Sequence, residues 1–166
     1  MTQDARGRRP PKTVVLGLGN ILLGDEGVGV RVVEEIERTG GLPGVELVDG
    51  GTAGFSLLPF FDGAGLVLVI DAAADGAPPG TVTLTRPAFS AAIPPVLTPH
   101  DVGLKNILDA LALGDERPEI VLLTISVAEA DRASLELSPP VAEAVREAAD
   151  RVRRFLSGPE GSSTSR

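Results

Sequence analysis

Four acidic residues and the single histidine of this 166-residue chain follow its apolar segments. They are Asp25, Glu26, Asp49, Asp71 and His100. Carboxylate oxygens and an imidazole nitrogen together suit borderline divalent ions such as nickel, zinc or iron. If the fold brings these side chains to one place, their types indicate a metal-binding site.

The elements that must position them alternate between strands and helices. Buried strands are predicted at 14–18, 45–48, 66–71 and 119–128, with a proline-bounded edge strand within 77–87. Helices are predicted from Glu26 to the glycines at 40 and 41, at 55–61, at 102–113, and at 139–155, the last with Ser138 as its cap. This order predicts an α/β fold, a three-layer sandwich whose mostly parallel, twisted sheet of about five strands has helices on both faces. In such sheets ligands bind beyond the carboxyl ends of the strands, where the acids lie.

One domain is expected, at residues 13–157, between a flexible extension at 1–12 and a disordered polar tail at 158–166. No apolar run approaches the roughly 18 residues that span a bilayer, and the polar start lacks the features of a secretory signal. We therefore expect a cytoplasmic protein without membrane insertion.

The composition excludes several kinds of chemistry. The chain has no cysteine, so disulfides, thiolate metal sites and a cysteine nucleophile are ruled out. A formal net charge of −8 repels phosphate backbones, and an aromatic content of 3% leaves little to stack on bases. We expect no nucleic-acid partner.

The glycine-rich stretch after the first strand resembles a phosphate-binding turn only in part. Gly17 and Gly19 begin a dinucleotide fingerprint, but Leu22 stands where its third glycine should be. Asp25 and Glu26 replace the Lys-Ser or Lys-Thr of a P-loop, so the charge is inverted. A bound cation is favoured here over a nucleotide.

Each candidate also has a structural explanation. An acid at a helix start gains about 0.3–1 kcal/mol from the helix dipole, which would account for either acid of the turn taken alone. Asp49, in "DGGT", is equally well explained as a turn residue that bonds to nearby amides, and Asp71 could cap the following loop. His100, in "TPHD", would ordinarily be a surface residue. Their shared position at one edge favours Glu26, Asp71 and His100 as the metal-contacting set.

Several separated motifs occur in one order: "GLGNILLGDEGVGVRVVEEI", "VDGGTAG", "LVIDA" and "TPHDVGLKNIL". From about Val14 to Phe155 the chain thereby resembles the hydrogenase maturation proteases, endopeptidases that trim the C-terminus of the large subunit of [NiFe]-hydrogenases. The resemblance implies an α/β sandwich with metal-contacting positions at Glu26, Asp71 and His100. It further implies that the metal is nickel already loaded into the large-subunit precursor, with other divalent ions substituting in vitro.

Within that resemblance we expect water to attack the scissile carbonyl, activated by the metal or by a carboxylate, with Asp49 as an auxiliary catalytic group. The fourth core strand departs from the family pattern. It leads into Ser-Val-Ala-Glu where relatives have a glycine-containing turn with Pro-Glu, so no role is assigned to Glu129.

The sequence also carries features of three other functions. A serine hydrolase would use Ser56, but Leu58 replaces the final glycine of a nucleophile elbow. An aspartic-protease dyad lacks its Asp-Thr-Gly or Asp-Ser-Gly context. A non-enzymatic nickel chaperone with the same three ligands remains compatible with the sequence.

Overall fold

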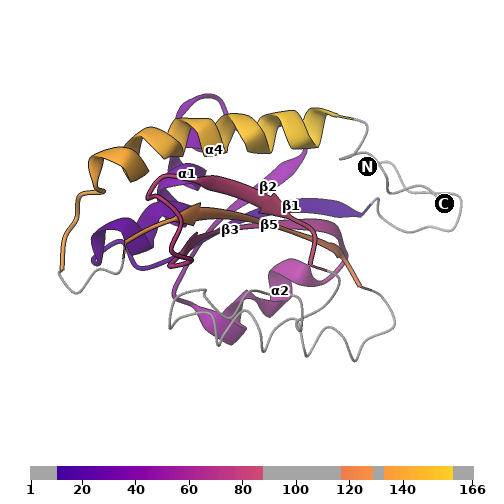
Figure 1. Ribbon diagram of the computed structural model, residues 1–166. Coiled ribbons are helices and arrows are strands. Elements are labelled where there is room, and N and C mark those ends of the chain that lie inside the picture. The colour runs from indigo at the N-terminus through magenta and orange to yellow at the C-terminus, as the bar shows by residue number, and fades with distance from the viewer. Residues whose placement is uncertain (1–10, 88–116, 129–132, 159–166) are drawn as a thin grey trace, which may run out of the picture.

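Within its described residues the protein forms a five-stranded sheet. The computed structural model describes residues 11–87, 117–128 and 133–158 (Figure 1). The strands are β1 (Lys12–Leu18), β2 (Val45–Gly51), β3 (Ala64–Ala73), β4 (Val82–Thr85) and β5 (Glu119–Ser126). Their order is β2-β1-β3-β5-β4, and neighbours are parallel except for β4, which is antiparallel to β5. The carboxyl ends of the four parallel strands therefore share one edge, called the carboxyl edge below.

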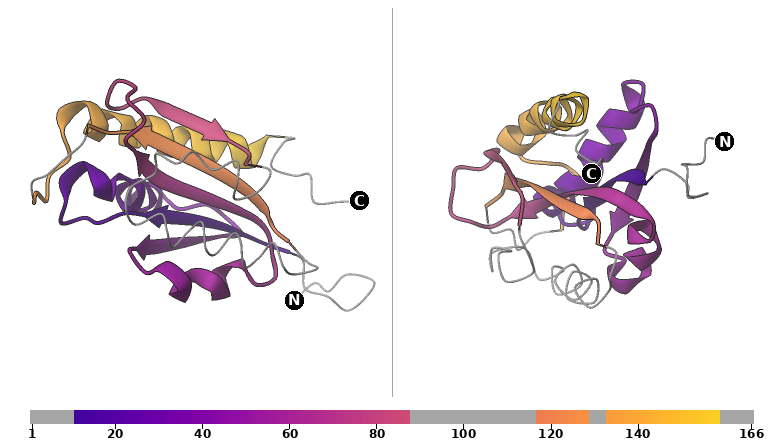
Figure 2. Two further views of the ribbon diagram at one scale, coloured as in Figure 1. Left: turned by 60° about the horizontal axis from the view of Figure 1, so that its bottom comes forward. Right: turned by 90° about the vertical axis from the view of Figure 1, so that its right-hand side faces the viewer.

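Helices cover both faces of this sheet. They are the 3-10 turns η1 (Gly24–Gly27) and η2 (Gly54–Leu57) and the α-helices α1 (Val28–Arg38), α2 (Leu58–Phe61) and α4 (Pro139–Ser157). Helices α1 and α4 lie side by side on one face and α2 lies on the other, and Figure 2 shows the three layers. The predicted α/β sandwich with its mostly parallel sheet is confirmed.

Alternating side chains of the central strands build a separate apolar core on each face. On β3, Leu68 and Ile70 pack toward α1 and α4, whereas Val67 and Val69 pack toward α2. All four side chains are completely buried. A strand buried on both sides reads as a continuous apolar run, which is why the sequence pattern predicts it.

Two strands continue past their predicted ends. The prediction that β2 ends at Val48 is wrong, since the strand runs to Gly51, and β3 runs past Asp71 to Ala73. The ladder with β5 sustains the longer β3, because it continues to the pairing of Ala73 with Ser126. Asp49 and Asp71 therefore lie inside strands, where the alternation decides which face each side chain leaves.

The first helix also begins differently from its prediction. The backbone forms the 3-10 turn η1 around Glu26, and regular α-helix starts at Val28. The last helix matches its prediction closely, from Pro139 to Ser157. The predicted helix at 102–113 and most of both predicted terminal extensions lie outside the described residues.

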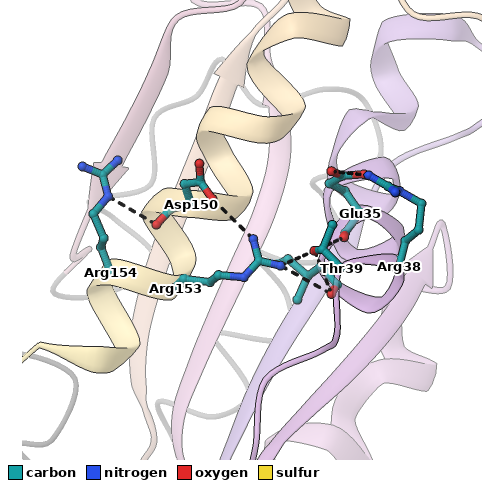
Figure 3. A network of polar contacts seen from close by, with 7 residues as sticks. Glu35, Arg38, Thr39, Asp150, Arg153 and Arg154 are labelled. Atoms are coloured by element: carbon teal, nitrogen blue, oxygen red, sulfur yellow. Dashed lines mark hydrogen bonds and ion pairs between the residues drawn. The ribbon is translucent and has the colours of Figure 1, made fainter.

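Helices α1 and α4 are tied together at the end remote from the carboxyl edge (Figure 3). Arg153 of α4 donates hydrogen bonds to the carbonyl oxygen of Ile36, at 3.5 Å, and to the hydroxyl of Thr39. It also pairs with Asp150, at 3.4 Å. The guanidinium thus lies at the negative end of the α1 dipole, where a cation is stabilising.

Candidate active site at the carboxyl edge of the sheet

The turn after β1 is packed against the strand ends through glycine backbone. A Cβ built on Gly19, whose φ is +127°, would lie 1.8 Å from the carbonyl oxygen of Glu26. A Cβ on Gly29 would lie 2.3 Å from the carbonyl oxygens of both Leu18 and Ile70. Only glycine permits such approaches. The start of α1 therefore lies directly on the ends of β1 and β3, and η1 is fixed at the carboxyl edge.

Glu26 is the second acid of this turn and lies in η1. The residue is partly exposed, yet its Oε2 atom is buried. The turn η1 lies against β3, the strand that carries Asp71. The structure thus places Glu26 and Asp71 on adjacent elements of the same edge.

Asp71 is a buried acid in an otherwise apolar strand. Its side chain is 2% exposed, and its Oδ1 accepts a hydrogen bond from the amide of Ala72 at 2.8 Å. Because Asp71 alternates with Val67 and Val69, it leaves the sheet on the α2 face. Burying a carboxylate costs free energy that an apolar residue would not, so its presence favours a functional role.

Asp49 lies on β2 and differs from Asp71 in exposure and direction. Val48, directly before Asp49, belongs to the α2-side core, whereas Leu47, two positions before it, packs against the core under α1 and α4. Strand alternation therefore directs Asp49 to the opposite face from Asp71. Asp49 is exposed, and its Oδ1 accepts a hydrogen bond from the amide of Gly51 at 3.0 Å. This is the turn bond that the sequence offered as the structural explanation of Asp49. Asp49 and Asp71 do not share a face of the sheet.

Asp25, the other acid of the turn, has a structural partner that the sequence did not reveal. Its Oδ1 accepts a hydrogen bond from the Ser138 amide at 2.6 Å, and its Oδ2 accepts one from the Ser138 hydroxyl at 2.7 Å. Asp25 is 9% exposed. Charge-assisted hydrogen bonds of this kind contribute about 1.5–3 kcal/mol each, with a further 0.3–1 kcal/mol from a carboxylate at a helix N-terminus.

The same contact corrects the predicted cap of α4. Ser138 occupies the N-cap position, but its side chain makes no capping hydrogen bond to the helix. Its hydroxyl is turned to Asp25 instead. Asp25, in the turn after β1, therefore binds the residue at which α4 begins, although 113 positions separate the two residues.

A short backbone pairing joins the same two segments. Leu23 and Ser134 form a parallel bridge, the Gly24 amide donates to the Ser134 carbonyl at 2.7 Å, and the Ser134 amide donates to the Leu22 carbonyl at 3.0 Å. The paired segments also expose two large apolar side chains, Leu22 at 58% and Leu135 at 66%. An apolar surface thus borders the turn that carries Glu26.

His100 and Glu129 lie outside the described residues, so the predicted contact of Glu26, Asp71 and His100 stays a prediction. In the described ranges no group of three or more acidic, histidine or cysteine side chains is placed to hold a metal ion. The hydroxyl of Ser56, the candidate serine nucleophile, donates to the carbonyl of Ala53 at 2.9 Å within its own turn. That bond is typical of a structural serine.

Comparisons with known proteins agree with this architecture. The family model described as hydrogenase maturation protease matches residues 30–154. The hydrogenase expression/formation protein HupD of Rhodobacter capsulatus is 37% identical over 153 residues, covering 84% of this chain and 72% of that protein. The hydrogenase 2 maturation protease of Escherichia coli K12 is 35% identical over 148 residues, covering 87% and 90%.

Solved structures show the same fold. The hydrogenase maturating endopeptidase HybD of Escherichia coli superimposes with a TM-score of 0.77 at 33% identity, covering 87% of this chain and 91% of that one. The [NiFe] hydrogenase maturation protease HybD of Thermococcus kodakarensis gives 0.72 at 27% identity, with coverage of 87% and 98%.

The α/β fold described above is thus shared with a class of peptidases. This chain belongs to the hydrogenase maturation protease family. Its predicted peptidase activity is confirmed at that level. Among the described residues, no helix combines the length and apolar character that crossing a membrane requires.

Proposed function

We propose that this peptidase removes the C-terminal extension of a nickel-loaded [NiFe]-hydrogenase large-subunit precursor, and that Glu26, Asp71 and His100 contact the nickel. The observation that carries the proposal is the location of Glu26 on a turn packed against β3, the strand that buries Asp71. The names of the relatives support the substrate class, since they are maturation proteins of hydrogenases.

The donor set suits a nickel ion carried by the substrate. Two carboxylate oxygens and one imidazole nitrogen match a borderline divalent ion and leave coordination positions for groups of the precursor. The N-terminal dipole of α1 opposes a cation by only about 1 kcal/mol or less. Two carboxylates carry full charges against that partial charge, so a divalent ion is still attracted to the edge.

Hydrolysis then proceeds on the peptide bond that this contact holds at the edge. The oxygen of water bonds to the scissile carbonyl carbon, the carbon–nitrogen bond breaks, and the leaving amine takes a proton. A carboxylate accepts the proton of the attacking water, and we propose Asp49 as this auxiliary group, acting from the exposed face of the sheet opposite to Asp71. The exposed position of Asp49 keeps it accessible to a bound substrate.

The apolar surface beside the turn supplies contact area for the precursor. Leu22 and Leu135 are exposed on paired backbone segments, so their positions are set before a partner arrives. Burial of these two side chains against a bound polypeptide would favour binding through the hydrophobic effect. We place the reaction in the cytoplasm, with neither nucleic acid nor membrane insertion involved.

The decisive experiment is the intact mass of the precursor before and after incubation with the purified protein. We expect the nickel-loaded precursor to lose its C-terminal extension and the nickel-free precursor to remain intact. Glu26→Gln should abolish the cleavage while the protein stays folded. Full cleavage by Glu26→Gln would remove this residue from the mechanism, and an unchanged precursor mass with the native protein would favour the nickel chaperone instead.

A further inference from the structure

We infer that Asp25 is a positioning residue that holds Glu26 in place by binding Ser138 at the start of α4. The inference rests on the proposed function, in which Glu26 contacts the nickel of the precursor. Asp25 precedes Glu26 in the same 3-10 turn, and it is the buried member of the pair.

The turn is held from two sides. On one side the backbone of Gly19, at the end of β1, lies against the carbonyl oxygen of Glu26, with no space for a side chain between them. On the other side both carboxylate oxygens of Asp25 bind Ser138, at 2.6 and 2.7 Å. The peptide that carries Glu26 is therefore fixed between the sheet and the last helix.

Asp25 affects the reaction only by positioning Glu26. Its two oxygens accept hydrogen bonds from the amide and the hydroxyl of Ser138, so its carboxylate is directed at the protein and away from a substrate. The backbone bond from Gly24 to Ser134 holds the turn to the same segment without this side chain. Removal of the carboxylate is therefore expected to loosen the position of Glu26 while the fold persists.

Substitutions at Asp25 can separate the effect of its hydrogen bonds to Ser138 from the effect of its negative charge. In Asp25→Asn, the amide oxygen still accepts from the Ser138 amide and the amide nitrogen can donate to the Ser138 hydroxyl, so both contacts are kept. In Asp25→Ala both are lost. Ser138→Ala is milder, because it removes the hydroxyl and keeps the bond from its backbone amide.

The kinetic constants for precursor cleavage provide the first readout. A misplacement of about 1 Å at a reacting group can cost about 100-fold in rate, so we expect Asp25→Ala to lower kcat at least about tenfold with little change in KM. Asp25→Asn should remain within about threefold of the native protein, and Ser138→Ala should lie between the two. If Asp25→Ala does not fold, Ser138→Ala carries the test.

Arg153→Ala is the matched control, because Arg153 also binds α4 to the segment that follows β1, but at the far end of α1, remote from the site. We expect it to lower the melting temperature and to leave kcat unchanged. If Asp25→Ala loses no more kcat than Arg153→Ala at an equal loss in melting temperature, Asp25 is only a stabilising residue and the inference is overturned.

A double-mutant cycle with Glu26→Asp tests whether Asp25 acts through Glu26. A shared mechanism predicts that Asp25→Ala costs much less kcat in the Glu26→Asp background than in the native one. Fully additive losses would overturn the inference and leave the proposed function intact. Full cleavage by Glu26→Gln would instead overturn the proposed role of Glu26, so the two failures are distinguishable.

Discussion

The α-carbon of Gly19 and the carbonyl oxygen of Glu26 are in direct contact, since a Cβ on Gly19 would lie 1.8 Å from that oxygen. Glu26 lies seven positions after Gly19, in a turn that leaves the end of β1 and folds back against it. The requirement for glycine is therefore steric as well as conformational. The glycine allows the Glu26 peptide to lie against the end of β1, and so a turn that resembles a phosphate-binding turn places an acid at the sheet edge.

Gly19→Ala should displace Glu26 and reduce precursor processing. With a φ of +127° and no space for the methyl group, we expect the free energy of unfolding to fall by about 3 kcal/mol or more. Gly44→Ala is the matched control, because Gly44 has a φ of +75° with nothing within 4 Å of its Cβ position. It should cost about 1–2 kcal/mol and leave cleavage unchanged. Normal cleavage by Gly19→Ala would show that the turn can move without consequence.

Asp71→Asn and Asp49→Asn should affect cleavage unequally. Asp71 is buried beside the turn, whereas Asp49 is exposed and leaves the sheet by the other face. We expect Asp71→Asn to lower kcat/KM by at least about 100-fold and Asp49→Asn by about tenfold or less. Both variants should stay folded, since each keeps a side-chain oxygen for its backbone hydrogen bond. Measured kcat/KM values in the reverse order would contradict the roles assigned to these two residues.

Leu22→Ser and Leu135→Ser test the apolar surface. Both side chains are already exposed, so neither change should alter the melting temperature by more than a degree or two. Burial of part of a leucine against the precursor corresponds to about 1 kcal/mol, so KM should rise about three- to tenfold per substitution. Cleavage assays at varied precursor concentration measure this directly. An unchanged KM in the double variant would remove these side chains from the substrate surface.

Arg153→Ala should lower stability without touching the site. The loss of its bonds to the end of α1 is expected to cost about 1 kcal/mol, because the side chain is largely but not fully buried. For a chain of this size that corresponds to about 2–4 °C in melting temperature. Arg154→Ala serves as the control, since its bond to the carbonyl of Asp150 lies within one exposed helical surface. Calorimetry of both variants should show a clear shift for the first and almost none for the second.

The sequence predicts the layers of this fold because strands buried on both faces appear as apolar runs. It also places Asp71 correctly at the carboxyl edge. The face that Asp49 leaves could not be predicted, because that depends on β2 continuing past Val48, with Asp49 still paired to Gly17 of β1.

The role of Asp25 could not be predicted either. A serine before a helix is ordinarily interpreted as a local cap, and nothing in the pattern around Ser138 indicates a partner 113 positions away. Once that partner is known, only Glu26 of the two acids in the turn remains for the substrate. The two acids of the turn therefore have different roles. Asp25 stabilises the contact with Ser138, and Glu26 takes part in the proposed chemistry.

The measurement that tests the central claim most directly is a crystal structure of the protein grown with zinc. We predict a single anomalous peak with one oxygen of Glu26, one oxygen of Asp71 and one ring nitrogen of His100 at about 2.0–2.2 Å. A well-ordered His100 on another side of the molecule, with no ion shared by the two carboxylates, would contradict the account.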